Sequence, residues 1–108
     1  MKKKLKKDNL KNITYLEDLY EIIKKRDKEK IKKSYTKQLL RKGSNTIAQK
    51  VAEESTELII DYLDGSKKRT IEEASDLIYH IFVLLYSKKI EIKDIQKELN
   101  KRHNVRSK

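Results

Sequence analysis

Two stretches of the chain decide its expected fold, KVAEESTELIIDYL at residues 50–63 and RTIEEASDLIYHIFVLL at residues 69–85. Both place apolar residues at intervals of three or four positions, which is the periodicity of an amphipathic helix. The 108 residues contain two glycines and no proline, and strand-like alternation bounded by turns is not found. We therefore expect an all-α protein, a helical bundle of about four to five helices.

Capping signals place the ends of these helices. Thr14-Tyr-Leu-Glu17 and Thr70-Ile-Glu-Glu73 both have the capping-box pattern of a helix start. Ser34 can cap a short helix that Gly43 ends, and Asp64-Gly65 is a stop signal. Together the signals predict helices over approximately residues 14–33, 34–42, 45–63, 70–87 and 92–103.

The length of the chain allows one domain, because 108 residues and 12.9 kDa are too few for two separate cores. We expect a flexible Lys-rich lead-in at residues 1–12, a single domain at 13–104 and a tail at 105–108. Hydrophobic residues make up 36% of the chain and charged residues 42%, with a mean hydropathy of −0.90. A core this small is expected to be completed by a second copy, which predicts a homodimer.

Several protein classes are excluded or disfavoured by composition. The absence of cysteine excludes a disulfide framework, a thiol nucleophile and a Cys-ligated metal site. The longest nearly continuous apolar run, Ile78 to Tyr86, is far shorter than the roughly 20 residues that span a bilayer. The N-terminal MKKKLKKDN is charged but lacks the apolar segment of a secretory signal. We expect a cytoplasmic protein that has no membrane partner.

The formal net charge of +11 suggests a polyanionic partner, either a nucleic acid or a multiply phosphorylated small molecule. Of the 28 basic residues, however, 23 are Lys and 5 are Arg, and specific phosphate or base recognition usually relies on Arg. The chain has no Trp and one Phe, so stacking platforms for single strands are not evident. Most of the lysines are therefore interpreted as solvated surface, and no nucleic-acid partner is expected.

The acidic residues of the two decisive stretches share a spacing. Glu54 and Glu57 are three residues apart, as are Glu73 and Asp76, so each pair lies on one helix face. If the two helices pack antiparallel, the four carboxylates can converge. Enclosed carboxylates repel one another, and a hard divalent cation such as Mg²⁺ offsets this repulsion while also binding substrate phosphates. The pattern therefore indicates metal-assisted hydrolysis of a nucleotide polyphosphate.

Other interpretations of these residues remain open. An E-x-x-E pair on a Lys-rich helix also occurs on solvated surfaces, and Glu73 can act as the third residue of its capping box. Asp76 is harder to explain locally, because Asp is a poor helix former and lies beside an apolar run. Lys50 shares the face of Glu54 one turn earlier. His80, four residues after Asp76, more often stands at the edge of a core than in a ligand set.

Four segments together resemble a known family, namely SYTKQLL at 34–40, IAQKVAEESTE at 47–57, EEASDLIYHIFVLL at 72–85 and KELNKRH at 97–103. They are similar to phosphoribosyl-ATP pyrophosphohydrolases of histidine biosynthesis, which belong to the all-α nucleotide pyrophosphohydrolases. The signature of that superfamily is E-E-x-x-E, a spacer and E-x-x-D. The matching residues are Glu53, Glu54, Glu57, Glu73 and Asp76, with fifteen residues between Glu57 and Glu73.

The resemblance implies that Mg²⁺-dependent hydrolysis converts phosphoribosyl-ATP to phosphoribosyl-AMP and pyrophosphate. It implies metal ligands at Glu54, Glu57, Glu73 and Asp76. Catalytic roles are implied for Glu53, Glu54 and Lys50. Substrate or phosphate binding is implied at Lys50, Lys42, Arg69, Ser34, Tyr35, Thr36 and His80. Many relatives are fused to the cyclohydrolase of the next step, so a chain of this length is expected to be the stand-alone form.

Three alternatives to this activity remain open. A related all-α pyrophosphatase could act on another nucleoside triphosphate, a small basic helical protein could bind nucleic acid, and a helical module could serve a purely structural interaction. The second alternative gives Glu54 and Asp76 no function, whereas the enzyme needs both. The sequence assigns neither the general base nor the phosphorus atom, α or β, that water attacks.

Overall fold

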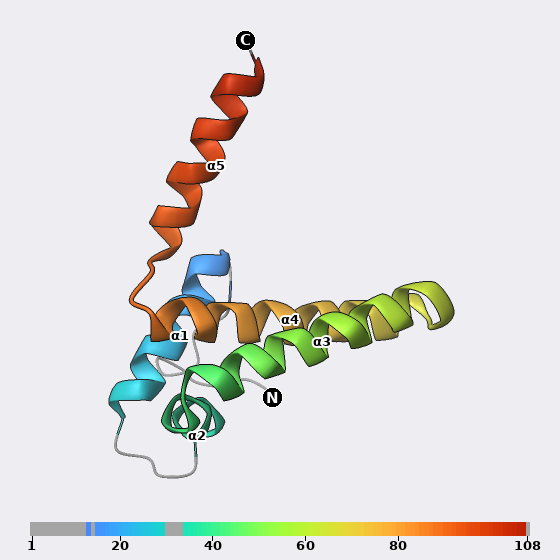
Figure 1. The fold of residues 1–108 in the computed structure, drawn as a ribbon, viewed down its shortest axis with the longest axis horizontal. Helices are drawn as coiled ribbons and strands as arrows, with labels where there is room; N and C mark the ends of the chain where they lie inside the picture. Colours follow the sequence, from blue (N-terminus) through green and yellow to red (C-terminus); the bar gives the residue numbers. More distant parts are fainter. Residues whose placement is uncertain (1–12, 14, 30–33, 108) are drawn as a thin grey trace.

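The computed structural model describes residues 13, 15–29 and 34–107, and these residues form five α-helices and no strand (Figure 1). The helices are α1 (Leu16–Lys28), α2 (Tyr35–Lys42), α3 (Ser44–Asp64), α4 (Lys67–Ser87) and α5 (Ile92–Ser107). The expected all-α fold is confirmed. The lead-in predicted at 1–12 lies outside the described residues.

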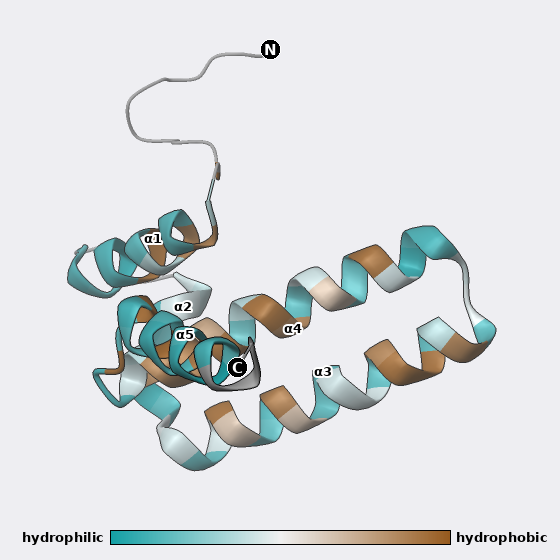
Figure 2. Ribbon diagram, turned by 90° about the horizontal axis from the view of Figure 1, so that it is seen from above, coloured by the Kyte–Doolittle hydropathy of each residue, from teal (hydrophilic) through white to brown (hydrophobic). Residues whose placement is uncertain are grey.

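The two longest helices, α3 and α4, run antiparallel side by side (Figures 1 and 2). Gly65 closes the turn between them by donating its N–H to the carbonyl oxygen of Asp61 at 2.8 Å. A Cβ atom at Gly65 would come within 2.9 Å of that same oxygen, so the turn requires a glycine. The short connection fixes which residues of α3 and α4 face one another.

The hydrophobic core lies where α1 and α2 pack against one end of the α3–α4 pair. Its buried apolar residues, drawn from four helices, are Tyr20, Ile23, Leu39, Ile47, Val83 and Tyr86. The other end of the pair extends away from α1 and α2 as a two-helix arm (Figure 2). One end of the α3–α4 pair is therefore held by apolar packing, and the other is held mainly by the two helices themselves.

The start of α4 differs from the predicted one. The helix begins at Lys67, where the Ser66 hydroxyl oxygen accepts the N–H of Arg69 at 3.1 Å. The predicted capping box at Thr70 is wrong, because the Thr70 hydroxyl donates to the carbonyl oxygens of Ser66 and Asp61. Glu73 therefore lies in the second turn of α4 and makes no capping interaction.

The first helix also differs from its prediction at both ends. Its N-cap is Tyr15, whose N–H donates to the carboxylate of Asp18 at 3.2 Å, so the capping box assigned to Thr14 and Glu17 is wrong. Thr14 itself lies outside the described residues. The helix ends at Lys28 rather than near Lys33, because the backbone becomes extended at Glu29. Residues 24–29 are all charged, so the last turn of α1 has no apolar side chain to add to the core.

The short helix α2 and the bounds of α3 follow the prediction closely. Ser34 caps α2 by accepting the N–H of Lys37 at 3.3 Å, and Gly43 separates α2 from α3. The last helix, α5, continues beyond the predicted end at His103 to Ser107. It projects away from the other helices and makes few contacts with them (Figure 1). Among the described residues, none of the helices has the length and apolar character needed to cross a membrane.

Gly43 is expected to be required by the backbone. Its φ of 95° and ψ of −179° lie in a region that is essentially restricted to glycine, although no atom would contact a Cβ there. Replacing Gly43 with Ala should lower the free energy of unfolding by about 1–3 kcal/mol. Urea denaturation followed by circular dichroism measures this loss. Ser44→Ala, one residue later and exposed, is the control, and an equal loss in both variants would contradict the backbone explanation.

Candidate functional site

Three carboxylates from the two long helices lie together. One oxygen from each of Glu54, Glu57 and Glu73 falls within 4.8 Å of the others, a grouping that could hold a metal ion. Glu54 is 7% exposed and Glu73 is 6% exposed, whereas Glu57 is open to solvent. The antiparallel packing of α3 and α4 therefore joins two acidic residues of one helix to one of the other. Asp76, the fourth predicted ligand, is exposed one turn further along α4 and is not in this group.

The electrostatics of this group are unfavourable in the absence of a cation. Burial, together with the negative charges of Glu57 and Glu54, raises the pKa of Glu73 to about 7. The Glu73 Oε2 atom is buried and has no hydrogen-bond partner among the described residues. Carboxylate oxygens are the ligands that hard divalent cations prefer, and an unpaired buried carboxylate oxygen is costly. The donor set and the unpaired atom both fit a divalent cation.

Two basic side chains flank the carboxylates. Lys50 Nζ lies 3.4 Å from Glu54 and 3.7 Å from Glu53. Its burial lowers its pKa, but the hydrogen bond and the charge of Glu54 outweigh this, and the pKa is raised. On the other helix, Arg69 contacts Glu73 at 3.8 Å. The predicted phosphate-binding residues Lys50 and Arg69 are thus beside the acidic group.

Asp61 joins this arrangement, although the sequence analysis did not single it out. Its carboxylate lies 3.6 Å from Arg69, which connects the last turn before Gly65 to the acidic group. The available signal was its position four residues after Glu57, which places both on one face of α3. Glu53 is exposed and accepts a hydrogen bond from the side chain of Gln49 at 3.1 Å.

The first turn of α2 is fastened to the middle of α4 by side chains. The Tyr35 hydroxyl lies 2.9 Å from Nε2 of His80, and the hydroxyls of Thr36 and Tyr79 form a hydrogen bond. His80 Nδ1 lies 2.7 Å from the carbonyl oxygen of Asp76, which can only accept, so Nδ1 carries a proton. In the neutral ring Nε2 is then the acceptor, and Tyr35 donates to it.

The predicted substrate-binding residues of this region differ in accessibility. Thr36 is fully buried and His80 is 5% exposed, whereas the Tyr35 side chain is largely open. Ser34 caps α2, and Lys42 is exposed in its last turn. Burial places Thr36 and His80 inside the protein, and Tyr35 is the open member of the network.

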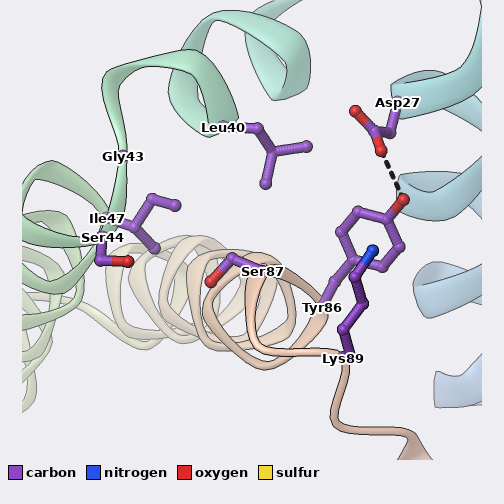
Figure 3. A pocket seen from close by; sticks show the side chains of 8 residues that line it. All are labelled: Asp27, Leu40, Gly43, Ser44, Ile47, Tyr86, Ser87 and Lys89. Atoms are coloured by element: carbon purple, nitrogen blue, oxygen red, sulfur yellow. Dashed lines mark hydrogen bonds between the residues drawn. The ribbon is translucent and has the colours of Figure 1, made fainter.

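A separate cavity of about 220 Å³ lies at the packed end of the molecule (Figure 3). It is lined by Asp27, Leu40, Gly43, Ser44, Ile47, Tyr86, Ser87 and Lys89. Burial raises the pKa of Tyr86 to about 12, and its hydroxyl donates to Asp27, as Figure 3 shows. This cavity contains none of the predicted site residues and is smaller than the roughly 300 Å³ at which ligand pockets begin. The candidate site is therefore the acidic group between α3 and α4.

Comparison with known proteins supports the kind of site that the geometry of the acidic group indicates. Residues 16–103 match the family described as PRA-PH, phosphoribosyl-ATP pyrophosphohydrolase. The chain belongs to this family. It is 46% identical over 87 residues to the phosphoribosyl-ATP pyrophosphatase of Sulfolobus acidocaldarius, a match covering 81% of this chain and 92% of that protein. Identity to the phosphoribosyl-ATP pyrophosphatase of Clostridium acetobutylicum is 47% over 88 residues, covering 82% and 80%.

A longer relative also matches. The histidine biosynthesis bifunctional protein HisIE of Bacteroides thetaiotaomicron is 45% identical over 92 residues, which cover 85% of this chain and 45% of that protein. The chain thus spans about half the length of this bifunctional relative. The predicted resemblance is confirmed, and with it the activity of the phosphoribosyl-ATP pyrophosphohydrolase family in histidine biosynthesis. Membership of this family favours a phosphoribosyl-ATP pyrophosphohydrolase over the alternative interpretations of the sequence.

The raised pKa of Glu73 predicts a pH dependence for this family member without metal. The folded chain keeps the Glu73 proton up to about pH 7, whereas the ordinary value is 4.5. In that window the unfolded chain binds fewer protons, so the free energy of unfolding should fall as pH rises. Glu73→Gln removes this contribution and should therefore gain stability relative to the wild type between pH 5 and pH 8.

Urea unfolding in EDTA at the two pH values measures the difference. Glu21→Gln is the matched control, because Glu21 is exposed on α1 and lies outside the acidic group. A Glu73→Gln variant whose stability relative to the wild type is the same at both pH values would contradict the assigned electrostatics.

Proposed function

We propose that this chain hydrolyses phosphoribosyl-ATP to phosphoribosyl-AMP and pyrophosphate with Mg²⁺ held between α3 and α4. The observation that carries the proposal is the grouping of Glu54, Glu57 and Glu73, together with the buried Glu73 Oε2 atom that has no hydrogen-bond partner among the described residues. Asp76 is proposed as a further ligand, because it is exposed one turn beyond Glu73. When bound, the cation supplies charge neutralisation of the phosphates and activation of water for hydrolysis.

The chain's own basic residues supply the remaining charge. Lys50 is held beside the carboxylates by Glu53 and Glu54, so its ammonium group can donate to phosphate oxygens without a large rearrangement. Arg69 lies on the opposite helix with its guanidinium against Glu73. Lys42 is proposed as a weaker phosphate contact from the end of α2. Glu53, exposed and adjacent to Glu54, is proposed to orient water.

Replacing one carboxylate should weaken metal binding without disturbing the fold. Glu57→Gln is the preferred change, because Glu57 is exposed and its loss should not disturb packing. It should lower kcat/KM for phosphoribosyl-ATP by at least about 100-fold. In the wild type, Mg²⁺ at 100 times its Kd should stabilise the folded chain by about 2.7 kcal/mol, and this gain should be mostly lost in Glu57→Gln.

Pyrophosphate release and thermal unfolding with and without Mg²⁺ measure the two effects. Glu21→Gln makes the same chemical change on the exposed side of α1 and should leave both unchanged. Normal turnover by Glu57→Gln would overturn the proposed ligand set. Hydrolysis of ordinary nucleoside triphosphates with none of phosphoribosyl-ATP would reject the substrate.

We further propose that the chain is a homodimer. The described part of the chain has six buried apolar residues, whereas several large apolar residues of α3 and α4 near the turn that joins these helices are exposed. These are Ile59, Ile60, Tyr62, Leu63 and Ile71. Apolar surface of this kind is typical of a contact between proteins, and a second copy of the arm would cover it.

A lysine in the arm should weaken this association. Leu63 is 70% exposed, so Leu63→Lys should not disturb the fold of one copy, but it would place a charge in the proposed contact. Analytical ultracentrifugation at micromolar concentration should show a dimer for the wild type and a shift towards monomer for the variant. Leu16→Lys, an equal change at an exposed position of α1, is the control. A wild type that sediments as a stable monomer would contradict the proposal.

A further inference from the structure

Tyr35 is the accessible part of an otherwise enclosed aromatic cluster. Its ring stacks on that of Tyr79, with centroids 6.1 Å apart and an angle of 29° between the planes. The ring of His80 meets it edge-on at 5.8 Å. Tyr35 is nevertheless 48% exposed, so about half of this residue is open to solvent.

The orientation of the Tyr35 ring is fixed by the residues that it contacts. The Tyr35 hydroxyl donates to His80 Nε2, and His80 is held in turn by the backbone carbonyl of Asp76. Tyr79 is anchored by the buried hydroxyl of Thr36. A ring held by neighbours loses little conformational entropy when a ligand stacks on it, so it is prepared for binding.

The Tyr35 ring lies further towards α2 than the carboxylates of the acidic group do. The helices α3 and α4 are antiparallel. Lys50, which precedes Glu54 on α3, and His80, which follows Glu73 on α4, therefore both lie on the α2 side of the carboxylates. His80 lies seven positions after Glu73, which is about 10 Å along α4. The Tyr35 hydroxyl is also close enough to Lys50 to contribute to its raised pKa. The acidic group, Lys50 and Tyr35 thus follow one another.

We infer that the exposed face of Tyr35 stacks on the purine base of the substrate, while His80, Thr36 and Tyr79 are positioning residues that hold it. This inference rests on the proposed function. A phosphorylated nucleotide has its charged end separated from its base by a ribose, and the order of acidic group, Lys50 and Tyr35 matches that order. Stacking on an aromatic side chain is a common way for proteins to bind a base. The buried Thr36 and His80 do not reach the substrate themselves.

The test compares a ligand that has a base with one that lacks it. Tyr35→Leu should raise KM for phosphoribosyl-ATP and the inhibition constant of AMP by about 10-fold, because the stacking surface is lost. The inhibition constant of pyrophosphate and kcat should change by less than about twofold, because pyrophosphate occupies the charged end alone. Tyr35→Phe keeps the ring and should retain most of the AMP affinity.

The controls separate binding from folding. Tyr15→Leu makes the same change at the exposed tyrosine that precedes α1 and should alter neither constant. His80→Asn should weaken AMP in the wild-type background but add little to Tyr35→Leu, because both act through one ring. Additive effects, or equal weakening of AMP and pyrophosphate in Tyr35→Leu, would overturn the inference.

The stacking can be tested even if the proposed function fails, because binding is measured without turnover. If the wild type does not hydrolyse phosphoribosyl-ATP, calorimetric binding of AMP and pyrophosphate to the same variants still tests the stacking. AMP that binds the wild type and Tyr35→Leu equally, or binds neither, would refute the inference whatever the substrate is.

Discussion

Repulsion among Glu54, Glu57 and Glu73 is the constraint on which the rest of this structure depends. Three carboxylates, two of them buried, oppose the helix packing that brings them together, and the buried Glu73 Oε2 atom has no hydrogen-bond partner within the described part of the chain. Lys50 and Arg69 offset part of this repulsion from outside the group. Their contacts leave the pKa of Glu73 at about 7, so the compensation is incomplete. Protonation of Glu73 supplies the rest below about pH 7, and the donor set also fits a divalent cation that would do so.

The distribution of apolar residues explains how the chain tolerates this repulsion. The core residues of α1 and α2 pack against only one end of the α3–α4 pair. The turn at Gly65 closes the other end and ties it to Asp61, whose side chain contacts Arg69. The acidic group is thus held from both ends by contacts that do not involve the carboxylates of Glu54 or Glu57. A site can be electrostatically strained when its supports are elsewhere.

The sequence predicted the parts of this arrangement that local periodicity determines. Spacings of three residues were sufficient to place Glu54 beside Glu57, and helix α2 followed from Ser34 and Gly43. The start of α4 was mispredicted because Ser66 and Thr70 are both acceptable caps, and only the turn at Gly65 selects the earlier one. The contact between Tyr35 and His80 joins residues 45 positions apart, and no local pattern encodes it. Asp76 was predicted as an equal member of the acidic set, whereas the structure leaves it outside the group of three.

Asp76 connects the two halves of the site in an unusual way. Its exposed side chain is what we propose as a further metal ligand, whereas its contact with His80 is made by the backbone carbonyl, which every amino acid possesses. Substitution at this position during evolution would therefore alter the ionic half and leave the aromatic half in place. The support that His80 gives to the Tyr35 ring is thus independent of which side chain stands at position 76.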